Sequence, residues 1–278
     1  MSPVLGIAGY VLREAASRKF IMAFMVGLTL VLAVVALGMR IDVIDGALAA
    51  SRLFGQEVRA TIQSVDVALR PVYQASAFIV FYGGILFGIV ACSDFAPSLM
   101  SPGRIEHLLA LPIQRWHLLA GTFLGVMTLA LGGTLYGTTG LVLIFGVKTG
   151  YWTVGPLVAG LMACVGFAAV YAVMLTMATL VRSAALCAAA GFAVLVGGII
   201  AGHRQDIAKA FEEGLSRSLF QAVTLVLPRL SALAEAAGDM AASLPLEVRS
   251  LGTLLVGVFV FGLAALVVGF WRFEGKDY

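Results

Sequence analysis

The chain has 278 residues, of which 61% are hydrophobic and 12% are charged, and its formal net charge is +3. Soluble domains carry about 25% charged residues, so the composition excludes a soluble globular protein and indicates an integral membrane protein. The small net charge and the absence of a basic block exclude a nucleic-acid partner, and the cysteines (Cys92, Cys164 and Cys187) form no C-x-x-C pair that would predict a metal site.

The first residues of the chain, 1–19, mix polar and apolar side chains and precede the first long apolar run. No small-residue cleavage site follows that run. We therefore interpret the run as a retained membrane span and not as a signal peptide.

Six charge-free runs along the chain are long enough to cross a membrane, which takes about 20 apolar residues. They are too long for the strands of a membrane barrel, so the sequence predicts an all-α integral membrane protein with six transmembrane helices in a single domain, 1–278. The third run has Gly132-Gly133 near its centre, but its halves are too short to span, so we expect one long helix. The predicted spans are 20–39, 71–93, 116–147, 149–181, 183–202 and 250–271.

The even number of spans places both termini on one side of the membrane. Basic residues before the first span, Arg182 in the shortest loop, and Arg272 and Lys276 after the last span favour the cytoplasm for that side. Basic residues in the two longest loops favour the opposite orientation, so charge alone is only suggestive. In the preferred orientation 94–115 is cytoplasmic and loops 40–70 and 203–249 lie outside.

Both outer loops are expected to be helical. In 40–70 the apolar residues Leu48, Leu53, Val58 and Ile62 recur at roughly helical spacing. In 203–249 the same holds for early apolar residues, and 218–228 is too short to span, so we expect it to lie at the interface or to pack on the bundle.

The sequence carries no pattern that indicates catalysis. There is no G-x-x-x-x-G-K-[ST] and no H-E-x-x-H, so we expect neither ATP binding by this chain nor an enzyme. The spans contain essentially no charged residues, which argues against an ion-coupled carrier. Their glycines favour close helix packing: Gly83, Gly84, Gly88, Gly132, Gly133, Gly137 and Gly140.

Polar residues within the spans are candidates for lining a translocation route, and equally for hydrogen bonding between helices. These candidates are Tyr73, Gln74, Tyr82, Thr134, Tyr136, Thr138, Thr139 and Tyr171.

Three stretches, in order along the chain, resemble those of type-2 ABC transporter permeases. The first follows the second span and comprises Ser93-Asp94, Pro97, Gly103, Glu106, Leu108-Leu109, Leu111-Pro112, Arg115-Trp116, Leu118-Leu119 and Gly121. The second is Leu227-Pro228-Arg229-Leu230, and the third is the ending Phe270–Tyr278, which is similar to the family's aromatic and charged tail with extra residues inserted. The two outer loops are longer than in minimal members of the family, which leaves room for an outer partner.

The resemblance implies an exporter in the cell membrane, here a bacterial inner membrane, with both termini in the cytoplasm. Two permease chains, identical or closely related, would pair with two cytoplasmic ATPase chains that bind ATP and Mg²⁺, while this chain itself holds no cofactor. An interfacial N-terminal helix would carry Arg13, Glu14, Arg18 and Lys19. The coupling segment that docks on the ATPase would be Gly103, Arg104, Ile105, Glu106, His107, Leu108, Leu109, Leu111, Pro112 and Arg115.

In that segment the apolar side chains would contact the ATPase, and Arg104 and Glu106 would form charge-assisted bonds to it. Pro112 would end the short helix. The alternative is an ATP-driven membrane anchor or mechanotransmitter that acts on an outer-face partner without moving a solute. The substrate stays open.

Overall fold

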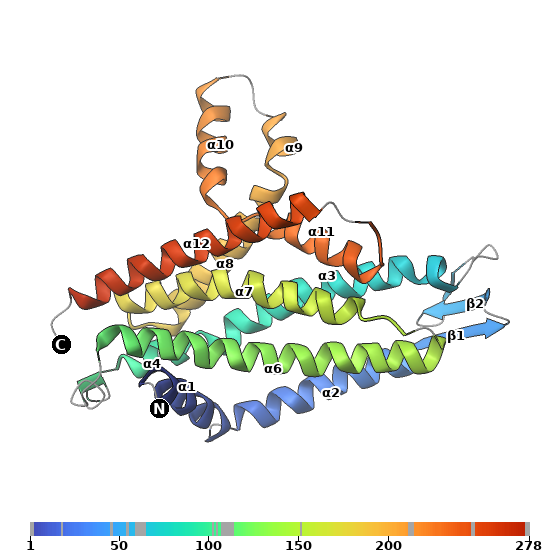
Figure 1. The fold of residues 1–278 in the computed structure, drawn as a ribbon, viewed down its shortest axis with the longest axis horizontal. Helices are drawn as coiled ribbons and strands as arrows, with labels where there is room; N and C mark the ends of the chain where they lie inside the picture. Colours follow the sequence, from blue (N-terminus) through green and yellow to red (C-terminus); the bar gives the residue numbers. More distant parts are fainter. Residues whose placement is uncertain are drawn as a thin grey trace.

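The computed structural model describes residues 3–17, 19–44, 47–53, 56–58, 65–101, 103, 105–106, 114–150, 152–210, 214–245 and 248–275. Among the described residues six helices are long and apolar enough to cross a membrane, in agreement with the six predicted spans; the bent pair Leu215–Val226 and Leu230–Ala241 would make a seventh only if it formed one broken span. The six helices run side by side along the long axis of the molecule (Figure 1). These helices are α2 (Phe20–Gly38), α3 (Val65–Cys92), α6 (Arg115–Thr149), α7 (Gly155–Leu180), α8 (Ala184–Gly202) and α12 (Val248–Glu274).

The third span is one uninterrupted helix, as expected. Helix α6 has 35 residues and ends at Gly150, which adopts the left-handed conformation (φ 71°) that glycine accommodates best. The fourth span was expected to begin at residue 149, but α6 continues to Thr149 and α7 begins at Gly155 with Pro156 in its first turn. Proline suits that position because the first amides of a helix have no partner within it.

The long helix α6 holds the N-terminal part of the chain through a row of glycines. The N-terminal helix α1 (Pro3–Ser17) lies directly against two of these glycines: a Cβ at Gly121 would collide with Ile7, and a Cβ at Gly125 would collide with Val11. Leu28 and Leu32 of α2 are seated against Gly137 and Gly140 in the same way. Small residues allow such close approach, and we call this row, completed by Gly133, the glycine seam.

The packing interpretation of the glycines therefore holds for only part of the set. It is confirmed for Gly88, whose added Cβ would lie 2.6 Å from the Phe167 ring, and for Gly133, Gly137 and Gly140 of α6. Gly83, Gly84 and Gly132 take no part in such packing within the described part of the chain, since an added Cβ would meet nothing within 4 Å there.

Helix α7 lies at the centre of the bundle and α2 at its edge. In its most apolar window 61% of the residues of α7 are buried, against none in α2. Aromatic contacts tie α7 to its surroundings: Tyr171 packs on Phe167 and on Phe123 of α6. Tyr73 of α3 meets Phe145 of α6 edge to face.

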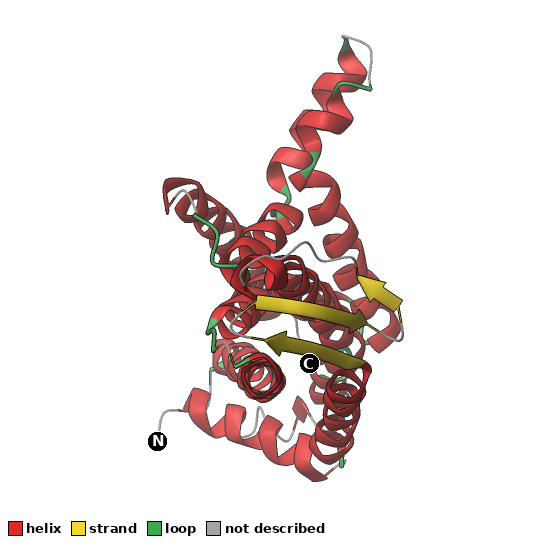
Figure 2. Ribbon diagram, turned by 90° about the vertical axis from the view of Figure 1, so that its right-hand side faces the viewer, coloured by secondary structure: helices red, strands yellow, loops and turns green. Residues whose placement is uncertain are grey.

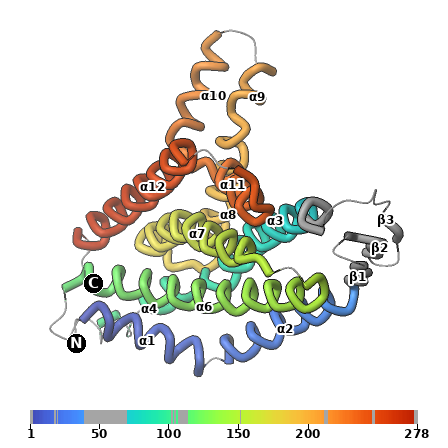
Figure 3. Tube along the Cα trace, turned by 45° about the vertical axis from the view of Figure 1, so that its right-hand side comes forward, coloured from blue at the N-terminus to red at the C-terminus, as the bar shows by residue number. Residues whose placement is uncertain are grey.

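Two short helices and both ends of the chain lie at one end of the bundle (Figures 1 and 3). Helix α1 crosses beneath the start of α6, and helix α4 (Phe95–Leu99) follows α3 closely. We call this end the base. It comprises α1, α4, the first turns of α6, the turn between α7 and α8, and the last turns of α12.

The prediction that 40–70 is helical is wrong for its first half. The structure has an antiparallel sheet at the end opposite the base, with strands β1 (Met39–Ile44), β2 (Ala47–Leu53) and β3 (Gln56–Val58) (Figure 2). Arg40 pairs with Arg52, and the register shifts between Asp42 and Val43. Helix resumes only at Val65, where α3 begins.

The sequence did contain the signal for this sheet. Residues Arg40-Ile41-Asp42-Val43 alternate polar and apolar, and Asp45-Gly46 is a dipeptide typical of hairpin turns. The apolar residues that suggested a helix, Leu48, Leu53, Val58 and Ile62, recur at helical spacing only approximately, so they are a weaker signal than the alternation and the turn dipeptide.

The prediction that 203–249 is helical is confirmed, for α9 (Arg204–Ala208), α10 (Leu215–Val226) and α11 (Leu230–Ala241). Helices α9 and α10 stand out sideways from the bundle (Figures 1 and 3). Helix α11 instead packs into the bundle against α3, α7 and α8, at a 58° bend from α10. Its face of small and branched side chains fits this burial: Leu230, Leu233, Ala234, Ala237 and Ala241.

Candidate coupling site at the base

The chain after the second span turns at the base and comes back to the bundle. Phe95, Ala96, Pro97 and Leu99 of α4 are buried, so the short helix lies inward against the spans. Gly103 then adopts a left-handed conformation (φ 80°), and the amide of Ile105 donates to the carbonyl of Ser101 at 3.1 Å. Glycine at this turn avoids the strain that a Cβ would introduce.

Ile105 is buried in a hydrophobic cluster that is separate from the main core of the bundle. Only 1% of its surface is exposed. The cluster draws on α1, α4, α6, α7, α8 and α12, so it joins the segment between α4 and α6 to most of the bundle. We call it the base cluster; its buried members are Ile7, Ala96, Met100, Ile105, Leu118, Leu119, Leu175, Ala178, Cys187 and Phe273.

The start of α6 is fixed by a reciprocal capping box. The side chain of Gln114 accepts a hydrogen bond from the amide of His117, and the Nδ1 of His117 accepts one from the amide of Gln114 at 3.0 Å. The indole of Trp116 donates to the same Gln114 side chain and stacks on His117. The amide of Gln114 is thus paired, and the amide of His117 also donates to the main-chain carbonyl of Gln114 at 2.9 Å, so α6 begins at a defined residue.

Arg115 joins the start of α6 to the end of α12. Its guanidinium donates to the main-chain carbonyls of Phe273 and Glu274, at 3.4 and 3.3 Å. The last carbonyls of a helix carry partial negative charge, so a cation there is stabilising. The two helices that flank the base are therefore linked by charge as well as by Phe273 in the base cluster.

The N-terminal helix presents one face to the bundle and the other to its surroundings. Glu14 lies on the buried face, while Arg13 and Lys19 are exposed. Lys19 separates α1 from α2 with a positive φ of 56°. This amphipathic arrangement agrees with the predicted helix, and Arg18 lies outside the described residues.

The predicted coupling residues are only partly described. Gly103, Ile105, Glu106 and Arg115 belong to the base as set out above. Ile105 differs from the expectation, because it faces the bundle and not an outside partner; its neighbour Glu106 is exposed. The others fall outside the described residues: Arg104, His107, Leu108, Leu109, Leu111 and Pro112.

The candidate lining residues divide by burial. Tyr73, Tyr171 and Thr138 are buried, and the hydroxyl of Thr138 is bonded to the Thr134 carbonyl of its own helix at 2.8 Å. Tyr136 and Thr139 are exposed.

Several of these side chains make contacts between helices. The hydroxyl of Tyr136 lies 2.8 Å from that of Thr29 on α2. The amide of Gln74 donates to Asp239 of α11 at 3.1 Å, and Thr134 accepts a weak bond from Cys164 of α7. Tyr82 stacks on Phe78 within α3. These contacts favour the alternative of hydrogen bonding and packing between helices for these side chains.

Two groups of interacting residues were not recognised in the sequence. His117 and Gln114 form the capping box at the base, for which the spacing of three residues before an apolar run was a usable signal. His203 approaches Ser231 and Glu235 at the far end of α8, and these residues are too distant in sequence for any pattern to connect them.

Comparisons of the chain with models of known protein families and with curated proteins find no match.

Proposed function

We propose that the chain is the membrane-spanning subunit of an ATP-binding cassette exporter, with the base in the cytoplasm and ATP hydrolysed by a separate pair of ATPase chains. The observation that carries the proposal is the way the segment after the second span is locked into the base. An element that transmits motion must be fixed to what it moves, and Ile105 in the base cluster provides that attachment.

Three further features support the proposal. Arg115 links the same segment to the end of α12, so displacement of the segment would act on two spans together. Glu106 is exposed beside the buried Ile105 and is available for a charge-assisted contact with a partner. The chain contains no P-loop, which fits an ATPase on another polypeptide.

A test is to purify the tagged chain from its native membrane in mild detergent and to measure Mg²⁺-dependent ATP hydrolysis in the preparation. We expect the wild-type chain to carry a copurifying ATPase. The double charge reversal Arg104→Glu with Glu106→Arg should remove it while leaving the thermal unfolding of the chain unchanged.

The matched control is a double charge exchange away from the base, Asp206→Lys with Lys209→Asp, which preserves an exposed ion pair at the end of α9. This variant should keep the copurifying ATPase. Absence of ATPase activity from the wild-type preparation would contradict the proposal, as would full retention of activity by the reversal at the base.

The second candidate is an ATP-driven mechanotransmitter that acts on an outer-face partner. The parts of the chain outside the bundle favour this possibility, since the sheet lies at the end opposite the base and α9 and α10 project sideways from the bundle (Figure 1). Deleting residues 204–219 separates the two: an exporter in which the hairpin is passive keeps its substrate-stimulated ATP turnover, whereas a transmitter that uses it loses its partner.

A further inference from the structure

The hairpin of α9 and α10 is anchored to the bundle at a polar hinge. The hydroxyl of Ser231 donates to the carbonyl of Ile199 at 3.1 Å and lies 3.1 Å from Nδ1 of His203. The other ring nitrogen of His203 lies 3.5 Å from the carboxylate of Glu235. Gly202 has no room for a side chain beside Ser231, so the end of α8 and the start of α11 are held in contact.

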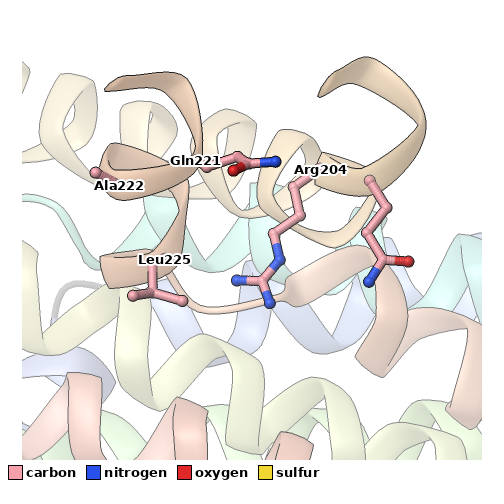
Figure 4. Close-up of a pocket in the computed structure, with 5 residues that line it drawn as sticks. Arg204, Gln221, Ala222 and Leu225 are labelled. Carbon is pink, nitrogen blue, oxygen red and sulfur yellow. The ribbon is translucent and has the colours of Figure 1, made fainter. Parts of the chain in front are cut away.

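A cleft opens between the two helices of this hairpin. Its volume is ≈ 410 Å³, which falls within the range of about 300–1,000 Å³ typical of ligand pockets. The side chain of Arg204 extends from α9 into the gap, and Gln221 of α10 points toward it (Figure 4). Its lining combines a cation and two amides with an apolar wall: Arg204, Gln205, Gln221, Ala222 and Leu225.

The positive charge at this cleft is not neutralised by the described part of the chain. Arg229, at the turn between α10 and α11, has a pKa below its ordinary value, because the group is partly desolvated and because the charge of Arg204 is near. Among the described residues no carboxylate forms an ion pair with either arginine.

The described acidic side chains of α9 and α11 have other partners. Asp206 bonds to Lys209 at 2.7 Å, which holds the pKa of its carboxyl below its ordinary value. Glu235 is paired with His203. Two like charges held close without a counter-charge create a site that attracts an anion.

The position of the cleft along the spans indicates where that anion comes from. Helix α8 has 19 residues and is about 28 Å long, close to the hydrocarbon thickness of about 30 Å. Arg204 follows two residues after its end, so it lies at the level of the lipid headgroups on the side away from the base.

The outer surface of α10 is apolar and exposed, as expected for a helix that rests in the membrane interface. Arginine and lysine at this depth commonly meet lipid phosphates, and apolar side chains of an interfacial helix meet the acyl chains. The exposed apolar residues of this surface are Leu215, Leu219, Val223 and Val226.

We propose that the cleft between α9 and α10 binds the phosphate headgroup of an anionic phospholipid, with Arg204 as the charged contact and Gln205 and Gln221 as hydrogen-bond donors, and with the charge of Arg229 adding to the positive potential of the site. The acyl chains extend along the apolar surface of α10. The proposal depends on the position of α8 in the membrane and not on an ATPase partner.

The test uses the full chain purified in a neutral detergent, with lipid adducts counted by native mass spectrometry during titration with phosphatidylglycerol or phosphatidylcholine. We expect phosphatidylglycerol to be retained in preference to phosphatidylcholine. Because the charge-assisted contact of Arg204 and the neighbouring positive charge of Arg229 are both lost, the double variant Arg204→Gln with Arg229→Gln should bind phosphatidylglycerol at least about tenfold more weakly.

Two further variants separate the cleft from general effects of charge and folding. Ala222→Phe fills the cleft from an exposed position without removing any charge, and it should also reduce retention of phosphatidylglycerol. Arg249→Gln removes one charge from an exposed residue of α12, outside the cleft, and should retain the lipid as the wild type does.

Three results would overturn the proposal. The first is equal retention of phosphatidylglycerol by the wild type and by both cleft variants, and the second is equal retention of the two lipids by the wild type. The third is displacement of the bound lipid by inorganic phosphate at matching concentration, which would make free phosphate the ligand.

Discussion

Single side chains at the base join elements that are far apart in the sequence. Arg115 is the clearest case, because its guanidinium reaches carbonyls 158 and 159 residues away. A lysine would supply the charge but not the planar set of donors that can serve two adjacent carbonyls. At this position the shape of the side chain therefore matters as well as its positive charge.

Replacing Arg115 with glutamine should lower the free energy of unfolding by about 1 kcal/mol, the usual net contribution of such a hydrogen bond. The measurement is the denaturation midpoint of the purified chain in mild detergent. The control is Arg249→Gln in the exposed first turn of α12, where a cation gains nothing from the helix dipole, so the change should lie within about 0.5 kcal/mol. Equal effects of the two substitutions would refute the assigned role of Arg115.

At the scale of elements, the contact between α2 and α6 rests on small residues and not on a broad buried surface. None of the most apolar window of α2 is buried in the isolated chain, yet Phe24, Leu28 and Leu32 each fit against a glycine of the seam. The contact is thus sensitive to the size of a few residues on α6.

Two neighbouring glycines of α6 provide a matched pair of substitutions. A Cβ at Gly133 would overlap the ring of Phe24, whereas one at Gly132 would meet nothing within 4 Å. We expect Gly133→Ala to destabilise the chain by about 1–3 kcal/mol through overpacking. Gly132→Ala should be neutral or stabilising by up to about 1 kcal/mol, since alanine favours helix.

The measurement is the thermal unfolding of the two alanine variants in the same detergent, and Gly133→Ala should melt at a lower temperature than Gly132→Ala. Equal melting temperatures would show that the ring of Phe24 moves aside without cost and that the seam does not control the position of α2.

How well the sequence predicted these elements depends on the strength of the local signal. The six spans follow from runs of apolar residues, because the length of a helix that crosses the hydrocarbon is set by the bilayer itself. The sheet of β1 to β3 was missed because alternation over four residues is a weak pattern beside a loose helical one.

The environment of individual residues was harder to predict. The burial of Ile105 and of α11 depends on which helices are neighbours, and a single sequence does not contain that information. His203 and Glu235 meet only because α11 returns to the end of α8, a contact between residues that no local motif relates.

At the scale of the whole molecule, the base and the α9–α10 hairpin are predicted to lie on opposite sides of the membrane. All three native cysteines are buried, so introduced thiols can be labelled against a low background. Glu106 at the base and Ser216 on α10 are both exposed and make suitable positions for cysteine.

A membrane-impermeant maleimide added to intact cells should label Ser216→Cys and not Glu106→Cys. After lysis both variants should react, because Glu106 is accessible only from the cytoplasm in the proposed orientation. Labelling of Glu106→Cys alone in intact cells would invert the orientation and exclude an ATPase at the base.

Helix α6 is a single rod of 35 residues that runs, without a proline or a break, from the capping box at the base to the end that carries the sheet. At 1.5 Å per residue it is about 52 Å long. As a lever pivoting near Arg115, it would convert a tilt of about 5° into a displacement of about 4.5 Å at Thr149, nearly the rise of one helical turn. A small movement at one side of the membrane would thus be magnified at the other.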